Sequence, residues 1–140
     1  MIFLDTNVLI AASVVGHPHH EACSRRVSLS ERSEVACAAH SMAECYSNLT
    51  RAGKGYGIPP LSAIEIVKSF SSSFMLVSLT AHETMQAIRD AAERGIAGPP
   101  LYDALLLACA RKVQARAIYT NDVSDFRRIA PDLASRIREP

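Results

Sequence analysis

Four short apolar runs, each the length of one buried strand, are separated by stretches with helical periodicity. The runs are Ile2 to Leu4, Val35 to Ala38, Phe74 to Leu79 and Ala117 to Tyr119. Strands that alternate with helices pair in parallel, because each helix returns the chain to the end of the sheet where the last strand began. The alternation therefore predicts an α/β fold, in which a parallel central sheet carries helices on both faces.

The expected helices follow from apolar spacing and from capping signals at their ends. Thr6 and Asn7 can cap the first helix. Two later helices should open with capping boxes, formed by Ser62 with Glu65 and by Thr80 with Glu83. The spacing predicts helices over residues 8–15, 19–30, 41–51, 62–70, 80–95 and 102–113. The tail from Pro131 should hold one more helical turn or a short edge strand.

Length and composition indicate a single globular unit. The 140 residues contain no repeat, linker or low-complexity tract, so residues 1–140 are expected to form one domain. The net charge of +1 creates no strong overall field, so a polyanion would have to be held by local basic clusters such as Arg51 with Lys54.

The cellular setting is expected to be the cytoplasm. The apolar N-terminal stretch lacks a basic leader and is interrupted by Asp5, which argues against a signal peptide. No stretch approaches the roughly 20 apolar residues that cross a bilayer. Four cysteines without a paired motif are typical of buried thiols in a reducing compartment: Cys23, Cys37, Cys45 and Cys109.

Acidic residues occur where a parallel sheet places its ligand crevice. Asp5 follows the first strand and Asp122 follows the fourth, and the carboxyl ends of parallel strands meet at one edge. Asp122 could instead only cap the helix that begins "DVSDF". Asp103 shares a helical face with apolar residues and needs a partner there, unless it only caps its helix or stabilises the helix dipole. In the helix over residues 41–51 the spacing predicts a buried face of Met42, Cys45, Tyr46 and Leu49, which favours a surface position for Glu44.

No basic residue lies in the segments "DTN", "YDALLL" and "TND" to neutralise these acids. Two carboxylates about 4 Å apart repel by roughly 4 kcal/mol at an effective dielectric of 20. Either the acids lie apart, or a cation holds them together. Ligation by oxygen alone suits Mg²⁺ or Mn²⁺, whereas Zn²⁺ would favour histidine and cysteine.

Four motifs in this order resemble the PIN-domain family, above all its small VapC-type toxins: "FLDTNVLI", "AECYSNLTR", "YDALLLA" and "YTNDVSDF". The resemblance covers essentially the whole chain. It implies that Asp5, Glu44, Asp103 and Asp122 form the acidic quartet of the family, with Asp125 in the place of a fifth acid. The residues that match the first and fourth motifs beside these acids are Thr6, Asn7, Thr120 and Asn121.

The resemblance also implies an activity. It predicts a Mg²⁺- or Mn²⁺-dependent endoribonuclease in which Asp5, Asp103 and Asp122 bind metal, while Glu44 binds metal or orients the attacking water. The same likeness implies a toxin with a cognate antitoxin, and a homodimer. The apolar segments 64–70 and 8–15 are candidate dimer surfaces.

Supporting roles follow for polar residues near these motifs. Thr6 and Thr120 could bond a carboxylate or the scissile phosphate, or only satisfy local backbone groups. The residues that could contact RNA phosphates or bases are Arg51, Lys54, Arg116 and Tyr56.

Other readings of the sequence lead to different functions. The same fold could bind RNA or protein without turnover, and a receiver-like signalling domain also gathers acids at strand ends. A haloacid-dehalogenase-like phosphatase would carry a second Asp where Asn7 stands. The segment "GHPHHEAC" offers His17, His19, His20 and Cys23, but without further ligands at zinc spacing, histidines at a helix entry are the better interpretation.

Overall fold

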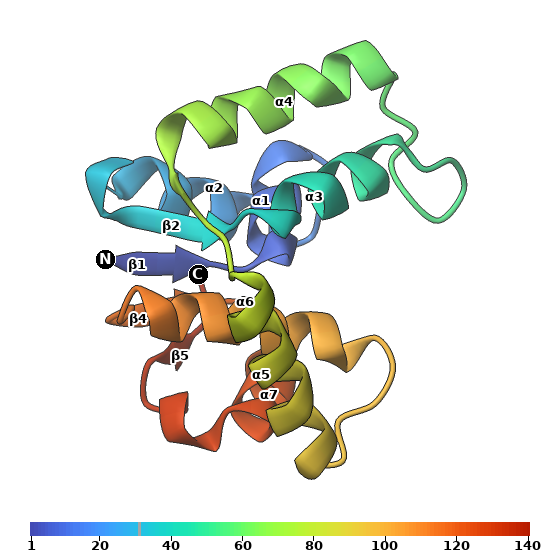
Figure 1. Cartoon of the computed structure of the whole chain (residues 1–140). Coiled ribbons are helices and arrows are strands. Elements are labelled where there is room, and N and C mark those ends of the chain that lie inside the picture. Colours follow the sequence, from blue (N-terminus) through green and yellow to red (C-terminus); the bar gives the residue numbers. More distant parts are fainter. Residues whose placement is uncertain (31) are drawn as a thin grey trace.

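The computed structural model describes residues 1–30 and 32–140, which form an α/β domain around a five-stranded sheet (Figure 1). The strands are β1 (Ile2–Leu4), β2 (Val35–Ala38), β3 (Met75–Val77), β4 (Ala117–Tyr119) and β5 (Ile137–Arg138). The helices are α1 (Thr6–Ser13), α2 (His20–Leu29), α3 (His40–Thr50), α4 (Pro60–Ser73), α5 (Ala81–Glu93), α6 (Pro100–Lys112) and α7 (Val123–Ile129). Single 3-10 turns span Arg32–Glu34 and Pro131–Leu133.

The sheet is parallel throughout, with the strand order β3-β2-β1-β4-β5. The central strand is therefore the first in the sequence, and Leu4 pairs with both Cys37 of β2 and Tyr119 of β4. Helices α1 to α4 lie on one side of the sheet and α5 to α7 on the other (Figure 1). The predicted α/β architecture with helices on both faces is confirmed.

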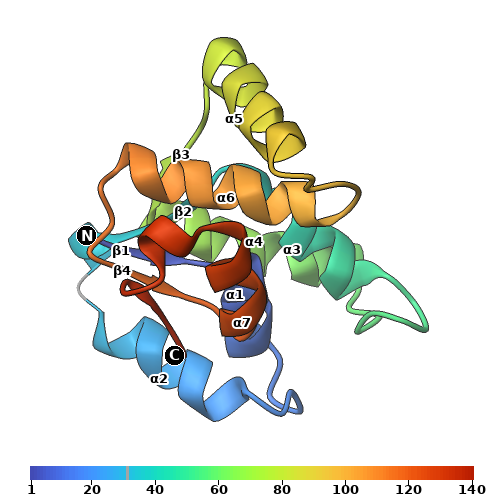
Figure 2. The ribbon, with the colours of Figure 1, turned by 90° about the horizontal axis from the view of Figure 1, so that it is seen from below.

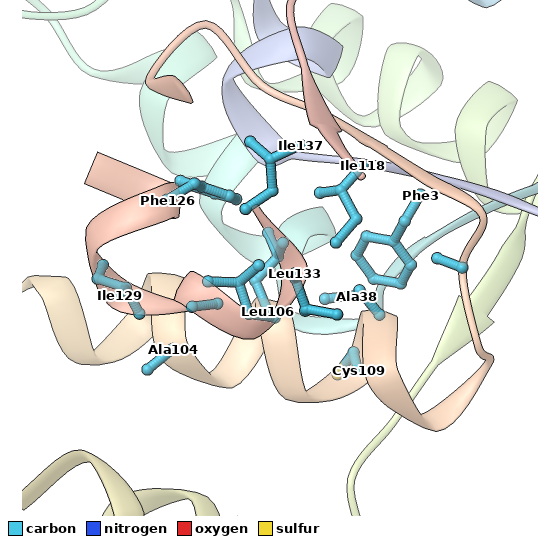
Figure 3. Close-up of a cluster of buried hydrophobic side chains, with 14 of the residues drawn as sticks. Phe3, Ala38, Ala104, Leu106, Cys109, Ile118, Phe126, Ile129, Leu133 and Ile137 are labelled. Atoms are coloured by element: carbon cyan, nitrogen blue, oxygen red, sulfur yellow. The ribbon is translucent and has the colours of Figure 1, made fainter. Parts of the chain in front are cut away.

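Two apolar clusters hold these layers together, because successive side chains of a strand point to opposite faces. Phe3 faces α6 and α7, beside Ile118 of β4, and Ile137 of β5 lies on the far side of Ile118 (Figure 3). Leu4 lies on the opposite face of the sheet, which packs against α1 to α4. All four cysteines are buried free thiols, as expected.

The strands lie where the sequence places them, with two adjustments. The third strand is limited to Met75–Val77, so the prediction of Phe74 to Leu79 was too long. The tail contains both features that were expected as alternatives, a 3-10 turn at Pro131–Leu133 and an edge strand at Ile137–Arg138.

The first helix begins earlier and ends earlier than expected. Thr6 and Asn7 lie inside α1, and Asp5 occupies the capping position without a capping bond from its side chain. The prediction that Thr6 and Asn7 cap this helix was wrong. The helix ends at Ser13 because Val14 is extended, which leaves Val15 84% exposed.

Proline determines the start of two other helices. Helix α4 begins at Pro60 and α6 at Pro100, because the fixed φ of proline suits the first helical turn and its missing N–H is not needed there. The capping box expected at Ser62 and Glu65 is therefore absent from α4. The box at Thr80 and Glu83 is present at the start of α5, as predicted.

Most apolar side chains of the segments proposed as dimer surfaces pack inside the protein instead, with Val15 as the exposed exception. Val8 and Leu9 of α1 are completely buried, and Val67 and Phe70 of α4 are each 8% exposed in the same cluster. Their apolar faces are core, a distinction that periodicity does not make. None of the helices described is both long and apolar enough to cross a membrane.

Candidate active site

The acidic residues gather at the carboxyl edge of the sheet because three neighbouring strands end there. Asp5 directly follows β1, and its backbone N–H donates to the carbonyl of Tyr119 at the end of β4 at 3.0 Å. Asp122 lies three residues beyond the same strand end. Helix α3 follows β2 and carries Glu44, while the first turn of α6 carries Asp103.

Asp5 lies deepest, with only 5% of its surface exposed. The pKa of Asp5 is raised to about 7, chiefly by burial and to a smaller extent by the negative charges of Asp103 and Asp122. A hydrogen bond from the Thr120 hydroxyl to Asp5 Oδ2, 2.7 Å long, acts against this shift by stabilising the charged carboxylate. The site thus holds a buried acid whose charge the protein itself offsets only in part.

Thr120 connects Asp5 to Asp122. Its hydroxyl is completely buried, donates to Asp5, and accepts from the backbone N–H of Asp122 at 3.0 Å and from Asn7 Nδ2 at 3.3 Å. Asn7 also donates to Asp122 Oδ2 at 2.8 Å and accepts from the backbone N–H of Asn121 at 3.2 Å. These bonds hold the first and fourth acidic segments in a fixed relation, although they are more than 110 residues apart.

A second network holds Glu44. Thr6 Oγ1 lies 2.8 Å from Glu44 Oε2 and 2.8 Å from Ser41 Oγ. An ionised carboxylate only accepts, so the Thr6 hydroxyl donates to Glu44 and the Ser41 hydroxyl donates to Thr6. Ser41 is completely buried, and sequence reasoning did not assign it a role. Its position three residues before Glu44, on the same helical face, was the available signal.

The buried face of α3 differs from the prediction. Ser41, Cys45 and Leu49 are buried, whereas Tyr46 is 36% exposed. The helix is rotated so that Glu44 lies half-buried beside this face, and the surface position favoured for it by periodicity was wrong. The rotation arises because Ser41 and Glu44 both bond Thr6 of α1, a contact that helical spacing does not encode.

Asp103 lies half-buried in the field of the other acids. Burial raises its pKa to about 6, and the nearby charges of Asp122, Glu44 and Asp125 contribute in that order. Arg128 partly opposes them. Burial and like charges both favour the neutral form of Asp103 and Asp5, so a cation placed between them would favour their ionised forms.

The remaining basic residues do not neutralise the quartet. Among residues 1–30 and 32–140, the ion pairs include none made by Asp5, Glu44, Asp103 or Asp122. Asp125 is different, because it pairs with Arg128 at 3.0 Å and its side chain is 59% exposed.

The donor set is all oxygen, which fits Mg²⁺ or Mn²⁺ better than zinc. In the part of the chain that the structure describes, no three Asp, Glu, His or Cys side chains already stand in a metal-binding arrangement. The quartet is close enough for its charges to raise the pKa values of Asp5 and Asp103.

Two basic residues expected near RNA lie away from the acids. Arg116 directly precedes β4, donates its backbone N–H to the carbonyl of Met1 and pairs with Glu34, so it lies at the opposite edge of the sheet. Its expected place at the cleft was wrong. Arg51 follows the last residue of α3, roughly 10 Å along the helix axis from Glu44, and bonds the carbonyl of Lys54.

The histidine-rich segment enters a helix, as the sequence indicates. His19 precedes α2 and His20 begins it, with His20 Nδ1 2.9 Å from the carbonyl oxygen of Ala11. Cys23 Sγ lies 3.7 Å from the side chain of Asn121. Tyr56 is 41% exposed, and its ring centroid lies 6.3 Å from that of His17.

Comparison with known proteins gives a family match and similar curated relatives. A family model described as the PIN domain matches residues 2–131. Ribonuclease VapC40 of Mycobacterium tuberculosis is 31% identical over 118 residues, which is 84% of each chain.

Solved structures share the fold at lower identity. The M. tuberculosis toxin VapC20, described as cleaving the sarcin-ricin loop, aligns with a TM-score of 0.73 at 20% identity, over 89% of this chain and 92% of that one. DNA-bound VapBC of Salmonella typhimurium aligns with a TM-score of 0.69 at 22% identity, over 99% and 98% of the two chains.

Proposed function

Because the chain belongs to the PIN domain family, we propose that it is a metal-dependent endoribonuclease and the toxin of a toxin-antitoxin pair. The relative named ribonuclease VapC40 and the toxin VapC20 support this activity. The observation that carries it is the set of acids at the carboxyl edge of the sheet, where Asp5 and Asp103 have raised pKa values and no basic partner among the described residues.

The four acids would have different roles toward a bound divalent metal ion. Asp5, Asp103 and Asp122 would bind Mg²⁺ or Mn²⁺, and Glu44 would bind the ion or orient the attacking water. When bound, such an ion lowers the pKa of a water molecule and polarises a phosphoryl oxygen, which is the chemistry that phosphodiester hydrolysis needs. Asp125 would act from the rim, since its side chain is exposed.

The hydrogen-bond networks would fix the orientation of these acids. The Thr120 hydroxyl donates to one carboxylate oxygen of Asp5, and Asn7 donates to one carboxylate oxygen of Asp122. Thr6, held by Ser41, orients Glu44. Partners that fix a metal ligand in this way raise the affinity of the site.

The proposed partners are RNA, a cognate antitoxin and a second copy of the chain. The VapBC complex among the solved structures supports the antitoxin. Exposed apolar side chains on the edge strand β3 and on α5 support a homodimer: Met75, Leu76 and Met85. A cytoplasmic location is supported by the four buried free thiols, which a reducing compartment preserves.

Cleavage of a labelled single-stranded RNA with Mg²⁺ or Mn²⁺ tests the proposal. We expect cutting that stops with EDTA and in Asp5→Asn, while Asp90→Asn, at an exposed carboxylate of α5, cuts like the wild type. Activity that survives both the chelator and Asp5→Asn would exclude metal-dependent chemistry at this site. RNA that is bound but never cut would instead favour a binding module of the same fold.

A further inference from the structure

A pocket of about 450 Å³ continues the candidate active site along the carboxyl edge of the sheet. The acids gather beyond β4, β1 and β2, and the pocket lies beyond β2 and β3, the next strand in the sheet order. Its walls include His40 and Glu44 of α3, Leu79 after β3, and Tyr102 and Leu105 of α6. We call it the His40 pocket. Because Glu44 belongs both to its wall and to the acidic quartet, a ligand there lies next to the candidate reaction centre.

The lining has the composition of a site for a small organic ligand. Most of its residues are apolar, such as Ala39, Val77, Leu79 and Leu105, and a few polar side chains interrupt them. Pockets of this size and mixture bind ligands that combine an apolar body with a few polar atoms. A nucleobase has this character, with two apolar faces and a polar edge.

One ring nitrogen of His40 supplies an independent observation. Nε2 of His40 is buried, and it has no hydrogen-bond partner among the described residues. A buried polar atom without a partner is destabilising, so a rotation of the His40 ring that turned this nitrogen toward a ligand with a polar edge would be favoured. His40 precedes Glu44 by one helical turn, so the two side chains are neighbours on the same side of α3.

Tyr102 provides an aromatic surface at the same place. It is 58% exposed, lines the pocket and directly precedes Asp103 on α6. Exposed aromatic rings beside a strand-binding groove are the usual stacking platforms for unpaired bases. Without a stacked ligand, much of the Tyr102 ring is exposed to water.

We propose that the His40 pocket binds one unpaired base of an RNA substrate beside the scissile phosphate, with His40 bonding the base edge and Tyr102 stacking on its face. The proposal rests on the proposed function, because the acids would cut the strand to which this base belongs. The shared residue Glu44 favours RNA over a protein partner, since the occupant must reach the acids. His40 is then a residue that determines where the strand is cut.

Binding measured without cleavage tests the pocket directly. Fluorescence anisotropy in EDTA, with labelled single-stranded homopolymers of A, C, G and U, should show that the wild type prefers one base. We expect His40→Ala to lose this preference and Tyr102→Ala to weaken binding of every polymer roughly tenfold. Tyr102→Phe should bind like the wild type. The matched control is His82→Ala, at an exposed histidine of α5 outside the pocket.

Cleavage of an RNA of mixed sequence separates this inference from the proposed function. A changed distribution of cut positions in His40→Ala supports the pocket, whereas an unchanged distribution overturns it and leaves the nuclease intact. If the protein shows a base preference but never cuts RNA, the proposed nuclease activity is wrong and the base-binding role of the pocket stands. If His40→Ala does not fold, Ala43→Leu replaces it, because this exposed lining residue would fill the pocket from its mouth.

A protein occupant gives a different result. If size-exclusion chromatography with light scattering shows a dimer that Ala43→Leu disrupts, and the base preference is unchanged, a second copy covers the pocket. That outcome would contradict the base-binding proposal.

Discussion

The carboxyl group of Asp5 links the chemistry of the site to the stability of the whole protein. Its pKa rises from 3.8 to about 7 on folding, chiefly through burial. Below pH 4 both the folded and the unfolded chain keep the proton, so Asp5 then costs nothing. Between pH 4 and 7 the unfolded chain releases the proton more readily than the native protein, which lowers the free energy of unfolding.

We therefore expect the metal-free protein to lose stability from pH 4 to pH 7, by up to roughly 4 kcal/mol from Asp5 at about 1.4 kcal/mol per pKa unit. Asp103 acts in the same direction. Urea unfolding in EDTA measures this, and Asp5→Asn should flatten much of the slope while abolishing cleavage. A wild type whose stability is constant over this range would show that Asp5 is already ionised in the native state.

Replacement of Thr120 tests the orientation of Asp5 without removing the charge of any acid. Thr120→Val keeps the shape but removes the donor to Asp5 and the acceptor for Asn7. We expect cleavage to fall about 10- to 100-fold, as for other partners that fix a metal ligand. Kinetics at saturating metal provide the measurement. Thr120→Ser retains the hydroxyl and should keep most of the activity, and equal losses in both variants would point to packing instead.

At the scale of the elements, α5 is the helix least supported by burial. Only Ala91 among its residues is buried, and the helix stands out from the rest of the fold (Figure 2). Its start is fixed by the capping box of Thr80 and Glu83, and a salt bridge joins Glu83 to Lys112 of α6 at 2.7 Å. These contacts with Lys112 and Thr80 lower the pKa of Glu83 to about 2.

We expect Thr80→Ala to destabilise α5 by about 1 kcal/mol, the usual cost of losing a capping side chain. Hydrogen exchange followed by mass spectrometry should show faster exchange in residues 81–93 and unchanged protection in β1 and β4. The matched substitution Thr84→Ala, one turn later in the same helix, removes no capping bond and should leave exchange nearly unchanged. Faster exchange throughout the protein would mean that α5 unfolds only with the whole domain.

At the scale of the whole molecule, β1 joins the two halves of the core. Phe3 is completely buried in the cluster with α6 and α7 (Figure 3). Leu4 is completely buried in the cluster with α1 to α4. Phe3→Ala should lower the free energy of unfolding by about 3–5 kcal/mol, because it leaves a cavity in a packed core. Urea unfolding measures this, and Leu61→Ala, at an 83% exposed side chain, should change little.

Local signals in the sequence were sufficient for most of the elements and for the acids at the strand ends, whereas the complete set of four acids came from the family resemblance. Short apolar runs and the capping box at Thr80 act over a few residues, so the chain displays them directly. The strand ends also predicted that Asp5 and Asp122 share an edge. The face of α3 was not predictable in this way, because the bond between Thr6 and Glu44 outweighs the apolar preference of Tyr46.

The sequence by itself determined the alternation of strands and helices and the carboxylates that follow the strands, because both depend on neighbouring residues. Only the tertiary structure decided that β1 lies between β2 and β4, that Ser41 and Thr120 hold the acids, and that a pocket opens beside Glu44. Those features depend on how two apolar clusters pack across one sheet. Packing joins residues more than 100 positions apart, and no local pattern records which of them meet.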